Sequence, residues 1–588
     1  MKRILVSVLA LSIAASPFVG CSKKEDAATA PKSDSSGTAA FVSDPLLSKL
    51  PSSTELFYFI NASGSAYKRF NQSPWAQTSS GLSSLQEAIN QMTTSGADPS
   101  QIAGLQIVVS TLQNLGLLSA DGKSAVDQVL SKAVFFAGIT NDTKQPVEVG
   151  MYLSGATGAS LKSKLPILRQ LLGDADLIVA EQKIAGVEGL VARPPQQPEG
   201  SPQEIALYLA ATDSLMAISL TQSGAESLFS SANTDTIKQM SETPEFKKAV
   251  SAVGVTPDSL AFGYVDVKKL VPVLEKAAAD NGASPDDQKQ IREIPIDSIA
   301  IAQSYDKQIV SALGVTVSGR SDIQTKFLAA LEGASIPASL AKLPTDTAFA
   351  VGIDMSFIAK LNDFLASIQD PDDAAMVQQL KDFRGVTLGL GIGDTSTSGA
   401  NSQALPLDVY LVVNANNRDK LVATAESMVD QQVPGGGAAA GASLWSPTDI
   451  DGTPTKFIQT GAPVDIYMSS PKNSDAIVIG SSERAIRKVL QASAGKQGGI
   501  ADSLQATLKD SLSPSKLASI YFNGIKTASL LDSMKETIEG MTGMPSTELD
   551  QTLNTQRLRQ LGLATGSISY SNGLFLVESV FDSSSGAK

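Results

Sequence analysis

The sequence predicts an α+β fold with two tandem homologous halves, each built from β-α-α-β-β units whose antiparallel sheets are covered by helices. Three observations favour this fold. A strand opened by proline occurs four times, helix signals follow it, and hairpin signals close the units. A chain of 588 residues is also long enough to form more than one domain.

The strand repeat is clearest at 50–63, which aligns without gaps to 343–356, and its outline occurs again at 256–266 and 513–523. Proline suits the first residue of a strand, and a terminal Asn or Asp suits the N-cap of the next helix. The opening prolines and closing residues are Pro51 and Asn61, Pro257 and Asp266, Pro344 and Asp354, and Pro514 and Asn523.

Helical spacing of apolar residues follows two of these strands, over 357–368 and 525–541. After Asp266 the helix is expected to start later or to kink, because Pro272 would fall in its second turn. A second helix start, in which proline follows a capping residue, is predicted further along each unit. It occurs at 98–101, 284–287 and 370–373, with a looser copy at 545–548.

Hairpins are predicted at the ends of the units, with turns at Asp306-Lys307 and at Asn572-Gly573. Between its two units, each half is expected to hold one β-α segment, beginning near Asp213 and near Asp475. We therefore expect a first domain at 46–320, a connecting helix or linker at 321–337 and a second domain at 338–584. A glycine-rich insertion at 434–441 would interrupt the second domain.

The first 20 residues are typical of an export signal peptide. Lys2 and Arg3 precede an apolar stretch, 4–15, that is too short to cross a membrane as a helix. The chain then reaches Cys21, its one cysteine. Residues 21–45 are rich in Ala, Ser, Lys and Asp, which predicts a flexible tether.

Phe18-Val19-Gly20-Cys21 resembles the lipobox of bacterial lipoproteins, with Phe18 in place of the usual leucine. The resemblance implies cleavage before Cys21 and a lipid on its sulfur, which would anchor the chain to a membrane. Ser22, which is not aspartate, would permit sorting to the outer membrane. The alternative is a lone cysteine after an ordinary signal peptide.

The body resembles uncharacterised secreted bacterial families whose repeats begin with an LPxDT-type strand, as at 343–347. Such families would carry over no catalytic residue.

Composition excludes several kinds of chemistry. The chain has no histidine, which rules out Ser-His-Asp triads and imidazole-ligated zinc sites. Its single cysteine rules out a disulfide within the chain. The net charge of −13 and the lack of a basic run argue against nucleic acid as a partner.

Motifs that could carry chemistry are better explained by structure. Gly116 to Gly122 has the wrong spacing for a phosphate loop, and Gly389, Gly391 and Gly393 are expected to leave a bare strand face under a helix. We expect a hairpin turn rather than a calcium loop at 449–452, and helix caps rather than metal ligands at 286–287 and 372–373.

Two further features stay open as candidate sites. Ser-x-x-Lys, which a histidine-free hydrolase could use, occurs at Ser65/Lys68, Ser339/Lys342 and Ser513/Lys516. Trp75 and Trp445 could be exposed aromatic anchors for sugar or protein, although packing under a loop is the favoured interpretation.

The sequence thus predicts a lipid-anchored cell-envelope protein that acts as a non-catalytic binding or structural module. We expect no catalytic residue, metal or cofactor, and Cys21 as the lipidation site. Its partners would be the membrane, through that lipid, and an envelope protein or apolar small molecule. The alternatives are an envelope carrier of an apolar or lipid ligand and a secreted hydrolase that uses Ser-Lys or paired carboxylates.

Overall fold

The computed structural model describes most of the chain after the predicted tether. The described residues are 43–72, 126–139, 147–195, 206–232, 234–280, 282–336, 338–361, 382–393, 406–432, 444–459, 465–472, 474–542, 555, 558–559 and 562–582. Several predictions fall outside them: the signal peptide with Cys21, Trp75, the glycines at 116 and 122, the helix starts at 98, 370 and 545, and the insertion at 434–441.

The described chain divides into two compact units at Val317 and Ser318. The strands of the first unit are β1 (Thr54–Ile60), β2 (Leu130–Ile139), β3 (Val147–Gly155), β4 (Ile178–Ile184), β5 (Val187–Arg193), β6 (Leu207–Ala211), β7 (Leu215–Ser219), β8 (Ala261–Asp266), β9 (Ile296–Asp306) and β10 (Gln308–Val317). Its helices are η1 (Leu47–Lys49), α3 (Ser65–Gln72), α7 (Val126–Val129), η2 (Lys162–Lys164), α8 (Leu165–Asp174), α9 (Gln222–Phe229), α10 (Thr236–Glu242), α11 (Pro244–Ala252), α12 (Val267–Asp280) and α13 (Pro285–Arg292).

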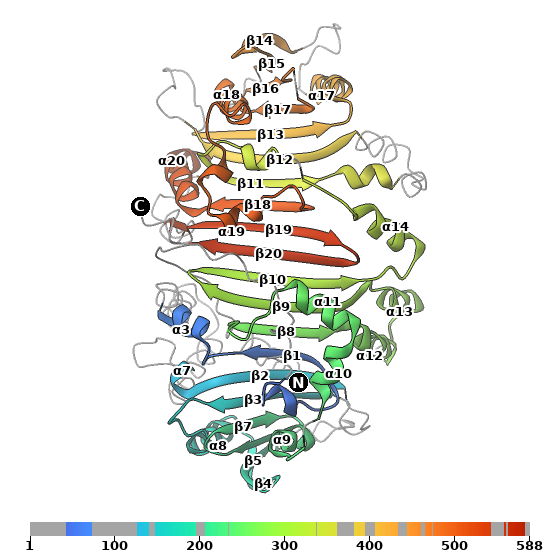
Figure 1. Ribbon diagram of the computed structural model, residues 1–588, viewed down its shortest axis with the longest axis vertical. Coiled ribbons are helices and arrows are strands. Elements are labelled where there is room, and N and C mark those ends of the chain that lie inside the picture. The colour runs from blue at the N-terminus through green and yellow to red at the C-terminus, as the bar shows by residue number, and fades with distance from the viewer. Residues whose placement is uncertain are drawn as a thin grey trace. The chain divides into compact units, whose positions relative to one another are not determined.

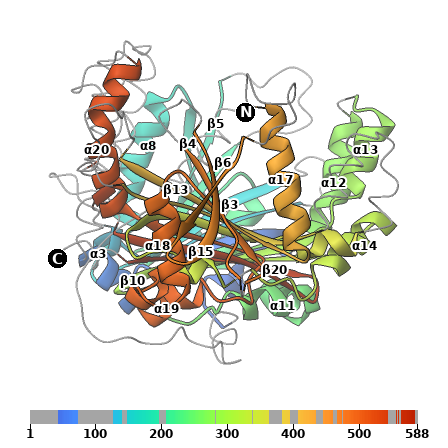
Figure 2. The same ribbon diagram turned by 90° about the horizontal axis from the view of Figure 1, so that it is seen from above.

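The second unit repeats this succession of strands (Figure 1). Its strands are β11 (Thr347–Asp354), β12 (Phe383–Ile392), β13 (Leu407–Ala415), β14 (Ser446–Ile450), β15 (Thr453–Ile458), β16 (Ile466–Ser469), β17 (Ala476–Gly480), β18 (Ala518–Asn523), β19 (Leu563–Ser571) and β20 (Leu574–Asp582). Its helices are α14 (Asp322–Leu331), η3 (Leu340–Lys342), η4 (Ser356–Lys360), α17 (Arg418–Gln432), α18 (Glu483–Ser493), η7 (Ile500–Ser503), α19 (Ala506–Asp510) and α20 (Gly524–Thr542). Helices α17 and α20 lie toward opposite ends of the strands (Figures 1 and 2).

The two units share one strand order. In the first, the antiparallel strands pair as β4-β5-β6-β7-β3-β2-β1-β8-β9-β10. In the second they pair as β14-β15-β16-β17-β13-β12-β11-β18-β19-β20. The predicted α+β class with antiparallel sheets is confirmed. Each strand of one unit therefore has a counterpart in the other, and the strand register assigns counterparts residue by residue.

The predicted β-α-α-β-β unit is clearest as β8-α12-α13-β9-β10. Asp266 caps α12, accepting the Lys269 amide at 3.2 Å, and Ser284 caps α13 in a capping box with Asp287. In the second unit Asn523 caps α20 by accepting the Lys526 amide at 3.1 Å. These three caps stand where the sequence predicts them.

Some local predictions are wrong. Of the two alternatives for helix α12, the later start is wrong, because the helix begins at Val267, where the cap on Asp266 fixes its first turn. Pro272 lies inside the helix, and the alternative of a kink stays a prediction. Asn61 is not the cap of α3, because Asp258 accepts the Ser65 amide at 2.6 Å in its place. After Asp354 the described chain holds only the short 3₁₀ helix η4, and the rest of the predicted helix lies outside the described residues.

The middle of each half is larger than the single β-α segment predicted. It contains β4 to β7 followed by α9, and β14 to β17 followed by α18. Strand β4 is mostly exposed and lacks the apolar alternation that would reveal it. No helix within the described residues is both long and apolar enough to cross a membrane.

The core contains a row of side chains that crosses five strands of each unit. In the first unit the ring of Phe136 lies over Gly150, where a Cβ atom would stand 2.4 Å from the ring. In the second the sizes are reversed, because a Cβ atom on Gly389 would stand 2.1 Å from the ring of Tyr410. The rows read Tyr264, Phe57, Phe136, Gly150 and Ser219, and Tyr521, Ala350, Gly389, Tyr410 and Gly480.

We predict that these large and small positions are coupled. Gly389→Phe alone should destabilise the second unit by about 3 kcal/mol or more through overpacking against Tyr410. Tyr410→Gly alone should cost about 4 kcal/mol through the cavity it leaves. The pair Gly389→Phe with Tyr410→Gly copies the first unit and should show a favourable coupling of about 1–3 kcal/mol in urea unfolding. If the changes in unfolding free energy of the two single variants simply added up in the double variant, positions 389 and 410 would not be coupled.

Candidate functional site

A buried acid stands at the same place in both units. Glu148 on β3 and Asp408 on β13 are 2% and 0% exposed. Strand register shows that the two acids are counterparts. Gly150, two residues after Glu148, pairs with Ser219 at the end of β7, and Tyr410, two residues after Asp408, pairs with Gly480 at the end of β17. A buried carboxylate needs compensating partners, and the two units supply different ones.

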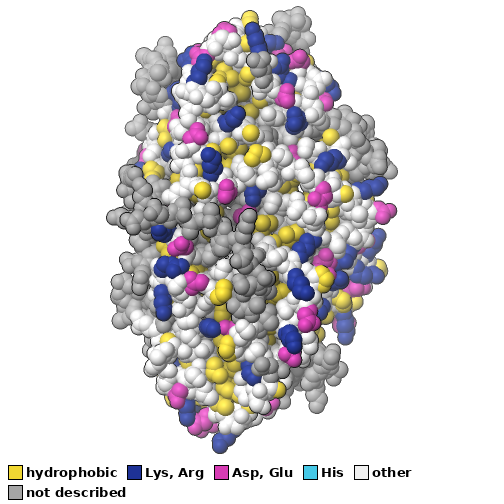
Figure 3. Space-filling view, viewed as in Figure 1, with side chains coloured by type: hydrophobic (Ala, Val, Ile, Leu, Met, Phe, Trp, Pro, Cys, Tyr) yellow, Lys and Arg dark blue, Asp and Glu magenta, His cyan; other side chains and the backbone are white. Residues whose placement is uncertain are grey.

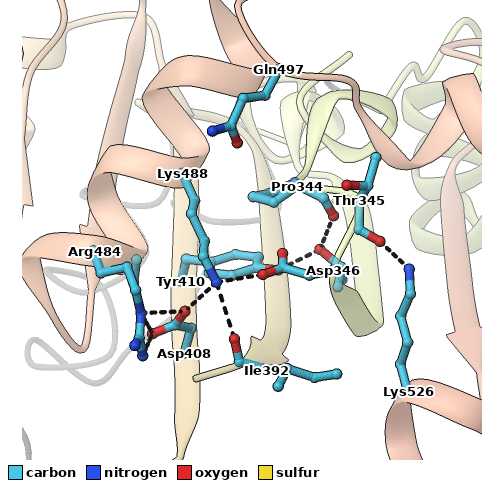
Figure 4. A network of polar contacts seen from close by, with 12 residues as sticks. Pro344, Thr345, Asp346, Ile392, Asp408, Tyr410, Arg484, Lys488, Gln497 and Lys526 are labelled. Carbon is cyan, nitrogen blue, oxygen red and sulfur yellow. Dashed lines mark hydrogen bonds and ion pairs between the residues drawn. The ribbon is translucent and has the colours of Figure 1, made fainter. Parts of the chain in front are cut away.

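In the second unit, two cations on α18 compensate the acid (Figure 4). Lys488 Nζ donates to Asp408 Oδ2 at 2.9 Å, to the Ile392 carbonyl at 3.0 Å and to Asp346. Arg484 Nη2 donates to Asp408 Oδ1 at 2.8 Å. This set of Asp346, Asp408, Arg484 and Lys488 is called the ion-pair network below.

The surroundings of the ion-pair network shift several pKa values. Burial alone would lower the pKa of Lys488, but hydrogen bonds and charges from Asp346 and Asp408 raise it. Burial lowers the pKa of Lys526, although the charge of Asp346 opposes this. Burial also raises the pKa of Tyr410, whose hydroxyl is hydrogen-bonded to Thr347. The ammonium of Lys488 is therefore held in its charged form.

In the first unit, only hydroxyl groups bond the acid among the described residues. Thr221 Oγ1 donates to Glu148 Oε1 at 2.7 Å, Ser223 Oγ lies at 3.4 Å from the same oxygen, and Ser53 Oγ donates to Oε2. Thr221 and Ser482 are the N-caps of α9 and α18, so Ser223 and Ser227 are the counterparts of Arg484 and Lys488.

Replacing two long cations by serines leaves a pocket of about 630 Å³ in the first unit. By strand register, several of its lining residues are counterparts of residues around the ion-pair network, but Ser53 stands in place of Asp346 and Glu55 in place of Ala348. The residues that line this first-unit pocket are Pro51, Ser52, Ser53, Thr54, Glu55, Ile139, Glu148, Ser223, Ser227, Thr234 and Lys269.

Two polar atoms of the pocket's residues are buried without a hydrogen-bond partner in the described structure: Thr54 Oγ1 and Glu55 Oε2. Thr347, the counterpart of Thr54, bonds to the Tyr410 hydroxyl, and Gly150 stands where that tyrosine would be. Burial raises the pKa of Glu55, with the nearby charge of Lys269 acting against it. Neither atom is exposed to solvent, so a bound molecule would reach them only if neighbouring side chains moved.

A second pocket, also of about 630 Å³, lies in the second unit around 494–499. Lys342, Lys496 and Lys509 line it, and all three are exposed. It contains no buried charged side chain comparable to Glu148.

The three Ser-Lys pairs do not form the couple that a hydrolase would need. Ser65 Oγ donates to Asp258, Ser339 Oγ contacts Thr387 Oγ1 at 2.8 Å, and Ser513 Oγ contacts Ser515 Oγ at 3.0 Å. Among these six described residues no hydrogen bond joins a serine to its lysine; the partner of Lys516, for example, is Glu578 at 2.7 Å.

Structural roles account for the other motifs that are described. Asp287 accepts from the Ser284 amide and hydroxyl, and Asp451-Gly452 forms the hairpin turn between β14 and β15. Trp445 is packed in a core cluster. The bare face of Gly389 lies under the ring of Tyr410 rather than under the predicted helix, because that ring projects from the adjacent strand. The described residues hold no group of three or more acidic side chains placed to bind a metal ion.

Sequence reasoning missed the pocket. Glu148 stands between Val147 and Val149 in an alternating strand, and its inward position was the available signal. On the face drawn in Figure 3, basic and acidic side chains are intermixed, so the surface pattern gives no further indication of a site.

Comparisons with known proteins do not identify the chain. No protein-family model matches it, and no curated protein matches it. Crystal form III of TP0453 has 10% identity and a TM-score of 0.23, covering 50% of this chain and 88% of that one. Crystal form IV has 9% identity and a TM-score of 0.22, covering 47% and 83%. At such low TM-scores the likeness does not establish a common fold.

We predict that Lys488→Met destabilises the second unit by about 3 kcal/mol, because it leaves buried carboxylates short of a cation. Thermal or urea unfolding would measure the change. Arg384→Met is the matched control, since its pair with Asp475 is exposed at 54% and 71% and should contribute about 0–1 kcal/mol. Equal effects of the two substitutions would refute the role given to the ion-pair network.

Proposed function

We propose that the chain is an exported, lipid-anchored cell-envelope protein that binds a small polar molecule in the first-unit pocket. One observation carries the binding role: a buried carboxylate, Glu148, faces a pocket whose counterpart in the second unit is filled by the protein's own Arg484 and Lys488. We propose no catalytic step, because Glu148 is held by hydroxyl groups.

The alternatives receive less support. Most of the pocket's lining is Ser, Thr, Glu and Lys, which suits a polar rather than an apolar ligand. A Ser-Lys hydrolase would need a serine hydroxyl within reach of its lysine, and the three described serines bond elsewhere.

The lipid anchor rests on the signal-like residues 1–20 and on Cys21. Replacing Cys21 with serine should prevent lipidation and release the chain from the membrane fraction, because acyl chains would provide the anchor. Mass spectrometry of the wild-type mature chain should show an acylated amino-terminal cysteine. An unmodified residue 21 in the native chain would rule out the anchor.

The binding role can be tested with four probes that share a four-carbon chain: n-butylamine, butyrate, 1-butanol and butyramide. At least one should show saturation-transfer NMR signals with the full-length chain. Ser227→Leu should abolish those signals by filling the first-unit pocket, whereas Ser163→Leu, at an exposed site of the same unit, should leave them unchanged. Binding of no probe, or equal binding to both variants, would overturn the role.

A further inference from the structure

We infer that the first-unit pocket takes an organic cation with a primary ammonium group on an alkyl chain, held by Glu148; this inference rests on the proposed function. The protein carries its own template for such a ligand. In the second unit, Lys488 places an alkylammonium group 2.9 Å from the counterpart carboxylate of Asp408.

The charge balance favours a cation. Glu148 is almost fully buried, and its hydrogen-bond partners in the described structure, Ser53, Thr221 and Ser223, are neutral. A buried carboxylate with neutral donors alone is costly, and a cation offsets that cost when it binds at hydrogen-bonding distance. In the second unit the same position has two cations, of which Lys488 is shared with a second acid, Asp346, whose counterpart in the first unit is Ser53.

The shape of the pocket favours the alkylammonium group. Ser227 stands where α18 carries Lys488, so the volume of an aminobutyl chain is missing from the first unit. Ile139, the counterpart of the Ile392 whose carbonyl accepts from Lys488, also lines the pocket.

The hydroxyl oxygens of Ser53, Ser223 and Ser227, which line the pocket, can accept the remaining ammonium protons. An ammonium group donates three hydrogen bonds, and Glu148 would accept one of them. A ligand that carried an anion here would meet two carboxylates instead, those of Glu148 and Glu55.

One cation already lines the pocket, and it does not exclude a second. Lys269 Nζ pairs with Asp266 at 3.4 Å. Its counterpart Lys526 coexists with Lys488 in the second unit, where it donates to the Thr345 carbonyl instead. The first-unit pocket can therefore hold Lys269 and a bound ammonium group together.

The test compares n-butylamine with its uncharged analogue 1-butanol on the full-length chain, with ionic strength matched. Butylamine should bind at least about tenfold more tightly, because it adds a charge-assisted hydrogen bond. Glu148→Gln should lower the affinity for butylamine at least about tenfold and so remove the preference for the amine over 1-butanol. Equal affinities for the two probes, or amine binding that persists in Glu148→Gln, would overturn the inference.

A second pair of variants keeps the inference testable if Glu148→Gln fails to fold. Ser227→Lys copies the second unit and should abolish amine binding while raising the Tm, because the new ammonium pairs with Glu148. Ser227→Met introduces a side chain that is similar in size to lysine but uncharged, so it should block amine binding without raising the Tm. Equal Tm values for the two variants would contradict an ammonium site.

The results also separate the inference from the proposed function. Suppose that 1-butanol or butyrate binds more tightly than butylamine and that Ser227→Leu abolishes this binding. The binding role would then stand, and the inference of a cation would fall. If none of the four probes binds, both fall.

Discussion

The need to compensate one inward-facing acid organises the described part of each unit. Glu148 and Asp408 project into the core near the start of the third strand and are almost fully buried, so each carboxylate needs partners. In the second unit the first turns of α18 supply Arg484 and Lys488, and the site is closed. In the first unit α9 supplies serines, and the site is open. One fold thus accommodates two solutions to one electrostatic problem.

Much of the fold could be predicted from local signals. The caps Asp266 and Asn523 and the Asn572-Gly573 turn act within a few residues of themselves, so the sequence displays them directly. The four prolines, by contrast, lie a few residues before the strands and not at their first residue. Strand β4 was missed because its exposed residues lack an apolar pattern. Asn61 was misassigned because its competitor, Asp258, is distant in sequence.

The site could not be predicted in the same way. It depends on Ser53, on Glu148 of β3 and on two serines of α9, Ser223 and Ser227, which lie far apart in the sequence and belong to no motif. The serines indicate a site only when they are compared with Arg484 and Lys488, their counterparts in the second unit. That comparison needs the strand register, which is known only from the folded sheets. The Ser-x-x-Lys pairs misled in the other direction. Their spacing suggested a hydrolase site, but their serine hydroxyls are hydrogen-bonded to residues other than the paired lysines.

The reversed ring positions in the two core rows also bear on how a duplicated chain avoids misassembly. Tandem copies of one fold are prone to exchange strands while they fold. Here β13 paired with β2 would force Tyr410 against Phe136, and β3 paired with β12 would leave a hole between Gly150 and Gly389. Steric mismatch thus disfavours hybrid sheets and lets each copy recognise its own strands.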